Sequence, residues 1–158
     1  MYSEQKQALA AELNFKHPAV LAVSGAKGCG KTTLLAALIP VLKARGLKVG
    51  VIRQAELDAA DPDTARLHNA GAAGVAVFSA GRYLLTEEFR LTEQDLLALF
   101  ERHSYDLVLL EGFNESGWPK IEVIRKAAGT GSVAFQPLAV AGDVPGADLP
   151  LDDPAPLA

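Results

Sequence analysis

Eight consecutive residues carry the clearest chemistry in this sequence. Residues 25–32 read Gly-Ala-Lys-Gly-Cys-Gly-Lys-Thr and satisfy the pattern G-x-x-x-x-G-K-[ST] at every required position. Glycines let several backbone N–H groups converge on one anion, where larger side chains would block a phosphate. Lys31 would supply a mobile cation for the β- and γ-phosphates, and the Thr32 hydroxyl would be a ligand to Mg²⁺. The segment therefore predicts a binding loop for a nucleoside polyphosphate.

The other residues of this phosphate loop have less specific roles. The backbones of Gly28, Cys29 and Gly30 are expected to line the phosphate site, and Thr33 to add a contact on the α-phosphate side. Lys27 could add charge to a bound phosphate or reach solvent, and solvent is favoured. The Cys29 thiol could be reactive at a helix N-terminus, but a small filler beside the glycines is favoured, because this lone cysteine shows no base partner.

A second candidate residue ends an apolar stretch. Residues 106–111 read Asp-Leu-Val-Leu-Leu-Glu, which predicts a buried strand over 106–110 followed by a carboxylate. Ligands of open α/β sheets lie at the carboxyl ends of the strands, so Glu111 is expected to project toward the phosphate loop. There it would bind Mg²⁺, directly or through water, or orient an attacking water. Lys31 and Glu111 are thus the predicted catalytic residues, and Thr32 and Glu111 the predicted metal ligands; the alternative is a Glu111 that faces solvent.

The elements that must position these residues alternate along the chain. Residues 19–23 form an apolar run that predicts a strand buried on both faces, and leucines at helical spacing over 31–45 predict the helix after the loop. Strands that alternate with helices predict right-handed βαβ units. The expected fold is α/β, P-loop NTPase-like, a mostly parallel sheet with helices on both faces. Further strands are expected at 48–52, 74–78, 121–124, 132–135 and 138–141, an edge strand or hairpin at 82–89, and helices at 3–14, from 62 to about 71, and from 92 to 100.

The helix after the second strand carries candidate substrate contacts. Asp61 is expected to be its N-cap, with Pro62 at the first helical position. Asp63 and Arg66 are three residues apart on one helix face, so they form either a surface ion pair or a substrate contact. His68 is expected on the outer face of that helix.

Composition limits the remaining possibilities. The chain has 158 residues, which predicts one domain over 1–158, with an N-terminal helix extension at 1–16 and a Pro-rich tail at 142–158, read as loosely packed or docked coil. The net charge of −4 argues against a nucleic-acid partner, because phosphate neutralisation needs a cationic face. No apolar run approaches the roughly 20 residues of a membrane span. The single cysteine favours a reducing cytoplasm.

The order of these motifs resembles a known family. Five motifs follow one another over about residues 19–125: GAKGCGKTTL, VGVIR, DTARLHNAGA, DLVLLEGFN and PKIEVIR. Together they resemble the MobB accessory proteins of molybdopterin-guanine dinucleotide biosynthesis. E-G-F followed by P-K-I-E-V-x-R is the most specific part. The resemblance implies GTP binding with Mg²⁺ and slow hydrolysis. It also implies assistance to the molybdenum cofactor nucleotidyltransferase that attaches GMP to molybdopterin, a contact with molybdopterin itself, and a homodimer paired through an extended segment, here 83–89.

The resemblance also assigns residues. The phosphate loop of the family is matched by Gly28, Gly30, Lys31, Thr32 and Thr33, and its acidic strand end by Glu111. An Asp and an Arg on the helix after the second strand are matched by Asp63 and Arg66. The last motif is matched by Lys120 and Arg125. Lys120 could pair with an anionic substrate, or it could be a solvated lysine on an edge strand. Arg53 stands where the family often carries Lys.

Departures from the family pattern leave other functions open. No His-rich segment follows the second strand, Asn114 stands where a Lys often follows E-G-F, and the chain ends in Pro-rich coil. Guanine preference rests on the resemblance; Asp143 could accept hydrogen bonds from guanine, and Trp118 could stack on a ring or cover a core edge. The alternatives are a P-loop small-molecule kinase, with its substrate near Arg53, Asp63 and Arg66, and a non-catalytic, nucleotide-dependent adaptor.

Overall fold

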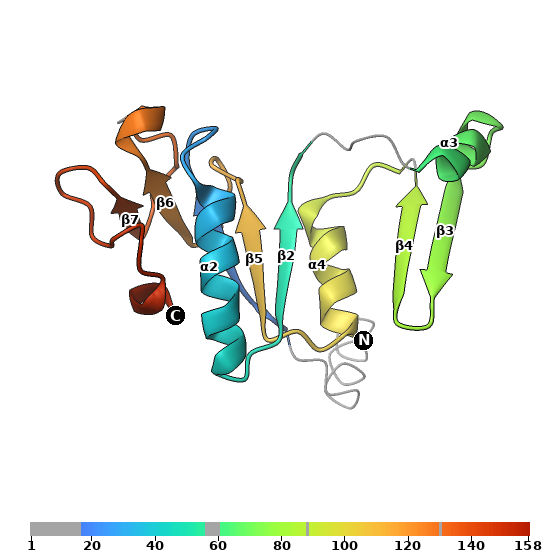
Figure 1. Ribbon diagram of the computed structural model, residues 1–158, viewed down its shortest axis with the longest axis horizontal. Coiled ribbons are helices and arrows are strands. Elements are labelled where there is room, and N and C mark those ends of the chain that lie inside the picture. Colours follow the sequence, from blue (N-terminus) through green and yellow to red (C-terminus); the bar gives the residue numbers. More distant parts are fainter. Residues whose placement is uncertain (1–16, 56–60, 88, 130) are drawn as a thin grey trace, which may run out of the picture. The chain divides into compact units, whose positions relative to one another are not determined.

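The structure, a computed structural model, describes residues 17–55, 61–87, 89–129 and 131–158 (Figure 1). The helix predicted at 3–14 lies outside these residues. The chain divides into two compact units: one contains the residues up to Gln54 together with Gln94–Ala158, and the other contains Ala55–Glu93. The two units are described separately.

A parallel sheet of five strands forms the centre of the first unit. The strands follow the order β2-β5-β1-β6-β7, and every neighbouring pair is parallel. Their runs of Val, Leu, Ile and Ala suit strands that are covered on both faces. The predicted α/β fold, P-loop NTPase-like, is confirmed. The strands are β1 (Ala19–Ser24), β2 (Val49–Arg53), β5 (Leu107–Glu111), β6 (Lys120–Ile124) and β7 (Ala139–Gly142).

Helices cover both faces of this sheet. Side chains alternate along a strand, so in β5 Leu109 points to one face while Val108 and Leu110 point to the other. The leucines of α2 (Lys31–Ala44) pack with Leu109, and Leu97 of α4 (Glu93–Arg102) packs in the second cluster. Figure 1 shows α2 in front of the strands. Two apolar layers therefore hold the carboxyl ends of β1 and β5 in fixed positions.

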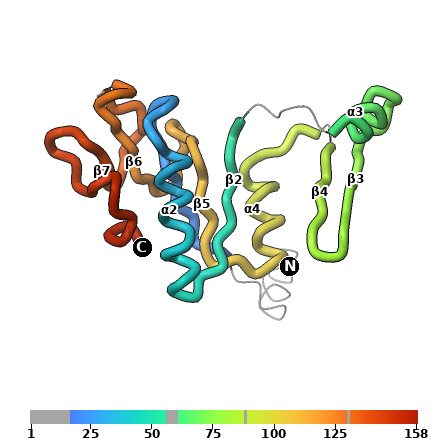
Figure 2. The backbone as a smooth tube through the Cα atoms, in the orientation of Figure 1, coloured from blue at the N-terminus to red at the C-terminus, as the bar shows by residue number. Residues whose placement is uncertain are grey.

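The Pro-rich tail is docked on the first unit. Leu149, Leu151 and Leu157 pack against the core cluster on the α2 side, and Leu149 forms an isolated parallel bridge with Ala141. A short 3₁₀-helix, η2 (Ala155–Leu157), contacts α2 near the C-terminus (Figure 2). Of the two possibilities for this coil, the docked one is confirmed.

The strand predicted at 132–135 does not form. The backbone N–H groups of Val133 and Ala134 donate to the carboxylate of Glu122 at 2.6 and 2.9 Å, and the Ser132 hydroxyl donates to the same carboxylate at 2.7 Å. A buried side chain thus takes the amides that a strand partner would otherwise bind. Another 3₁₀-helix, η1 (Lys126–Ala128), precedes this segment.

The second unit is a helix with an antiparallel hairpin. It holds α3 (Pro62–Asn69), β3 (Gly74–Ser79) and β4 (Arg82–Glu87), so the hairpin expected at 82–89 is confirmed in its described part. Asp61 caps α3 and accepts from the amides of Asp63 and Thr64, as predicted. His68 was wrongly expected on the outer face, since its ring bonds to the Thr86 hydroxyl on β4 at 2.8 Å. Within the described ranges, no helix is long and apolar enough to cross a membrane.

Candidate functional site

The phosphate loop lies between the end of β1 and the start of α2, at the carboxyl edge of the sheet. Gly25 has φ +141°, and a Cβ at this position would lie 2.4 Å from the carbonyl oxygen of Val123, so no other residue fits. Gly30 ends the loop with φ +99°, where a Cβ would lie 3.2 Å from the Arg125 guanidinium. Backbone conformation therefore favours glycine at both ends of the loop, and close packing against the backbone of Val123 requires it at Gly25.

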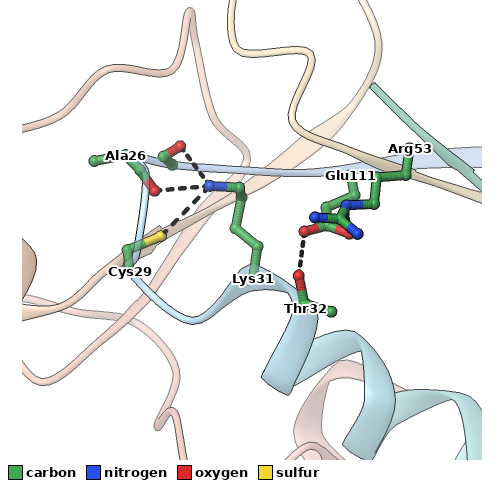
Figure 3. Close-up of polar contacts among 7 residues, drawn as sticks. Ala26, Cys29, Lys31, Thr32, Arg53 and Glu111 are labelled. Atoms are coloured by element: carbon green, nitrogen blue, oxygen red, sulfur yellow. Dashed lines mark hydrogen bonds and ion pairs between the residues drawn. The ribbon is translucent and has the colours of Figure 1, made fainter. Parts of the chain in front are cut away.

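Lys31 starts α2, and its side chain folds back over the loop (Figure 3). The ammonium Nζ donates to the carbonyl oxygens of Gly25 at 2.9 Å and Ala26 at 2.7 Å, and lies 3.9 Å from the Cys29 Sγ. The cation is thus held by neutral groups in a partly buried position. Such a cation is well placed to exchange these carbonyls for phosphate oxygens, which bind it more strongly because they are charged.

Glu111 ends β5 directly beside α2. Its Oε1 accepts a hydrogen bond from the Thr32 hydroxyl, and its Oε2 lies 3.4 Å from the Nε of Arg53 at the end of β2 (Figure 3). The carboxylate is buried, so the alternative of a solvent-facing Glu111 is wrong. The sheet register places Arg53 next to Glu111 and explains the ion pair.

The oxygens of Thr32 and Glu111 fit a hard divalent cation. Mg²⁺ prefers oxygen ligands, and it is usually bound through one or two protein groups together with phosphate and water. Among the described residues, no group of three or more His, Cys, Asp or Glu side chains could hold a metal. A magnesium ion at this site would therefore take its other ligands from the nucleotide and from water.

Comparisons with known proteins show the family to which the sequence belongs. A sequence model of the family described as MobB, molybdopterin guanine dinucleotide synthesis protein B, matches residues 20–143. This chain belongs to the MobB family.

Individual relatives give the extent of the similarity. The molybdopterin-guanine dinucleotide biosynthesis adapter protein of Escherichia coli is 38% identical over 138 residues, which are 80% of this chain and 79% of the relative. The adapter protein of the same name from Haemophilus influenzae is 38% identical over 113 residues, 68% of this chain and 64% of the relative. The crystal structure of Bacillus subtilis MobB has a TM-score of 0.70 at 24% identity and covers 88% of this chain and 93% of that one, which supports the MobB fold.

The α3 residues matched to MobB lie in the second unit. The Arg66 guanidinium is 3.7 Å from the Asp63 carboxylate, with the two side chains 83% and 89% exposed. An exposed pair at this distance contributes little to stability. The surface ion pair expected from their spacing is confirmed, and a contact with substrate stays a prediction.

Lys120, also matched to MobB, has an internal position. It is 1% exposed, and its ammonium donates to the carbonyl oxygens of Asn114 at 3.2 Å and of Ser116. The alternative of a solvated edge lysine is wrong, because β6 pairs with β1 on one side and β7 on the other. A contact between Lys120 and substrate stays a prediction.

Further polar residues join the phosphate loop without having been singled out for that place. Asn114 Oδ1 accepts from the Gly25 amide at 2.9 Å, and Arg125 Nε donates to the Cys29 carbonyl at 3.2 Å. The sequence marked Asn114 only as a departure from the MobB pattern and Arg125 only as part of its last motif. Their roles depend on contacts over 89 and 96 residues of sequence, which no local pattern encodes.

Two weaker candidates have structural contacts. Trp118 packs against the core cluster on the α4 side and so covers a core edge. Asp143 accepts from the amide of Lys126 at 2.6 Å, at the start of η1. A role for Trp118 or Asp143 in binding the base of the nucleotide stays a prediction from the sequence.

Proposed function

We propose that this chain binds GTP with Mg²⁺ and acts as an accessory protein in the attachment of GMP to molybdopterin. The observation that carries the proposal is the contact of Thr32 with Glu111 beside Lys31, at the carboxyl edge of a parallel sheet. Membership of the MobB family supports the pathway, and the curated relatives are named adapter proteins.

The residues have distinct roles in this proposal. Amides of Gly28, Cys29 and Gly30 and the start of α2 bind the phosphates, Lys31 neutralises the β- and γ-phosphate charge, and Thr33 contacts the α-phosphate side. Thr32 and Glu111 would hold Mg²⁺, which when bound would further neutralise the charge of the transferred phosphoryl group. Glu111 also orients the attacking water, and Lys31 stabilises negative charge in the transition state.

Hydrolysis in this proposal is slow. An arginine finger accelerates phosphoryl transfer by placing its guanidinium on the transferred group. The guanidinium of Arg53 pairs with Glu111, and that of Arg125 binds the Cys29 carbonyl. Each would have to leave its protein partner to take this role, so a partner protein or a second copy of the chain is the expected accelerator.

The partner in this proposal is the molybdenum cofactor nucleotidyltransferase, in the cytoplasm, with molybdopterin as the shared ligand. The chain works as a homodimer. The hairpin of β3 and β4 supports pairing between two copies of the chain, because it exposes large apolar side chains. These are Val77, Phe78, Tyr83, Leu84 and Leu85.

The decisive experiment titrates GTP, GDP and ATP by calorimetry with and without Mg²⁺, and repeats the series with the nucleotidyltransferase. We expect Mg²⁺-dependent GTP binding, slow release of phosphate, and faster formation of molybdopterin guanine dinucleotide when this chain is added. Transfer of labelled γ-phosphate to a metabolite would instead favour the kinase. Binding without turnover, even with the partner present, would favour the non-catalytic adaptor, and no binding of any nucleotide would refute the proposal.

A further inference from the structure

The loop that follows β5 is tied to the phosphate loop by one side chain. Asn114 Oδ1 accepts the hydrogen bond of the Gly25 amide at 2.9 Å. Gly25 is buried, so without this acceptor its N–H would lack a partner in a place that water does not easily reach. Loss of such an acceptor is costly, because the desolvated donor stays behind.

The backbone around Asn114 is shaped for this contact. Gly112 and Phe113 both have positive φ, +100° and +54°, so the chain turns sharply between the end of β5 and Asn114. A positive φ is unfavourable for phenylalanine and persists only where the surroundings enforce it. The Ser24 hydroxyl also donates to the Gly112 carbonyl at 2.6 Å, which ties the same turn to the end of β1.

A buried cation holds Asn114 from the other side. The Asn114 carbonyl oxygen accepts from the Lys120 ammonium at 3.2 Å and from the Phe135 amide at 2.8 Å. Lys120 is 1% exposed and also binds the Ser116 carbonyl. The main chain of Asn114 is thus fixed by β6 and by segment 131–138, while its side chain reaches Gly25.

We propose that Asn114 is a positioning residue of the phosphate loop: its side-chain oxygen fixes the first amide of the loop, and Lys120 fixes Asn114 in turn. The loop then needs little ordering when a polyphosphate binds, which is the general benefit of preorganisation. This inference rests on the proposed function, because it assigns a role in nucleotide binding.

The test compares Asn114→Leu, which removes the acceptor at similar size, with Asn114→Asp, which keeps an acceptor. Amide hydrogen exchange at Gly25 is measured in the nucleotide-free proteins. We expect exchange in Asn114→Leu to be at least about tenfold faster than in the wild type, and exchange in Asn114→Asp to stay slow. Asn114→Ala provides a second removal of the acceptor if Asn114→Leu does not fold.

Affinity for GTP with Mg²⁺ is the second readout. Asn114→Leu should bind about tenfold more weakly than the wild type. Asn114→Asp should approach wild-type affinity at high salt, where the added charge is screened. Wild-type protection of Gly25 in Asn114→Leu overturns the positioning role, and so does fast exchange with unchanged affinity. Failure of the wild type to bind any nucleotide overturns the proposed function instead, and the Gly25 measurement distinguishes the two failures.

Discussion

Apart from the exposed Lys27, three basic side chains lie at the phosphate loop or beside Glu111, and a different protein group binds each one. Lys31 binds the carbonyls of Gly25 and Ala26, Arg53 pairs with Glu111, and Arg125 binds the Cys29 carbonyl. The partners of Lys31 and Arg125 are neutral, whereas Arg53 already has a carboxylate. Lys31 and Arg125 would therefore gain more from a phosphate than Arg53 would, because a charged acceptor would replace neutral ones.

Lys31→Ala should weaken the binding of GTP with Mg²⁺ at least about tenfold, or ~1.4 kcal/mol. The reason is the loss of an ammonium group that folds back over the loop from the first residue of α2. Isothermal titration calorimetry measures the effect. Lys27→Ala is the matched control, because it removes the same charge from an exposed position of the same loop. Equal affinities for Lys31→Ala and the wild type would contradict the assignment of the phosphate loop.

The sequence predicted that Glu111 lies beside the phosphate loop, but it did not predict the contacts made by Asn114, Lys120 and Arg125. Lys31, Thr32 and Glu111 could be placed because each belongs to a local pattern whose chemistry is known. The internal position of Lys120 could not be predicted, since lysine is rarely buried and its carbonyl partners lie on a loop of unpredictable shape.

At the scale of elements, strands covered on both faces were the most predictable feature. The apolar runs of β5, β6 and the second half of β1 are sufficient for this, because consecutive buried side chains are typical of a strand covered on both faces. The strand predicted at 132–135 was wrong because a local pattern does not show which group binds the backbone amides. Its apolar residues suit a strand, but Glu122 of β6 takes its amides, and that contact depends on tertiary structure.

The packing of β2 against α4 leaves no room for a side chain at Gly50. A Cβ on Gly50 would lie 2.5 Å from the ring of Phe100, which is held edge-to-face by Tyr105 with ring centroids 4.8 Å apart. Gly50→Ala should therefore lower the free energy of unfolding by about 1–3 kcal/mol through overpacking. Denaturant unfolding measures the change. Gly117→Ala is the control, because a Cβ there meets no atom within 4 Å, and the two variants should not be equally stable.

The cap of α3 predicts a pH dependence. The hydrogen bond from the Thr64 hydroxyl, together with backbone N–H groups, lowers the pKa of Asp61 below its ordinary value. A carboxylate with a lowered pKa stabilises the folded state above its unfolded pKa, and this contribution is lost as the pH falls through the folded pKa. The amides of Asp63 and Thr64 should therefore exchange faster at acid pH than the intrinsic pH dependence of exchange predicts.

Two substitutions separate the cap from its charge. Asp61→Ala should speed the exchange of the Asp63 and Thr64 amides at neutral pH, because their acceptor is removed. Asp61→Asn keeps an acceptor, so it should keep slow exchange but lose the acid response. An acid response of the same size in Asp61→Asn would show that another group is responsible.

At the scale of the whole molecule, the two units differ in how completely they bury apolar side chains. The first unit has two core clusters, whereas Thr64 is the only buried residue among the described residues of the second unit's helix and strands. A two-stranded hairpin is marginally stable by itself. Phe78 and Tyr83, which lie opposite each other, are 81% and 70% exposed. The proposed homodimer would cover these exposed side chains.

Replacement of Phe78 and Tyr83 by Glu should therefore weaken dimerisation about 100-fold or more. Burial of each large apolar side chain contributes about 1.5–3 kcal/mol, and charges at the same positions would repel their copies. Sedimentation equilibrium measures the dimer dissociation constant. Leu99→Glu is the control, since Leu99 is an exposed apolar residue on α4 of the first unit. A wild-type protein that is monomeric at high concentration would refute the predicted homodimer.

The only cysteine of the sequence lies inside the phosphate loop, where it is 1% exposed and packed among the leucines of α2. A thiol-directed reagent can reach this sulfur only while the loop is open. The natural chain therefore carries its own probe of loop opening, and the rate of alkylation follows that motion without an engineered label.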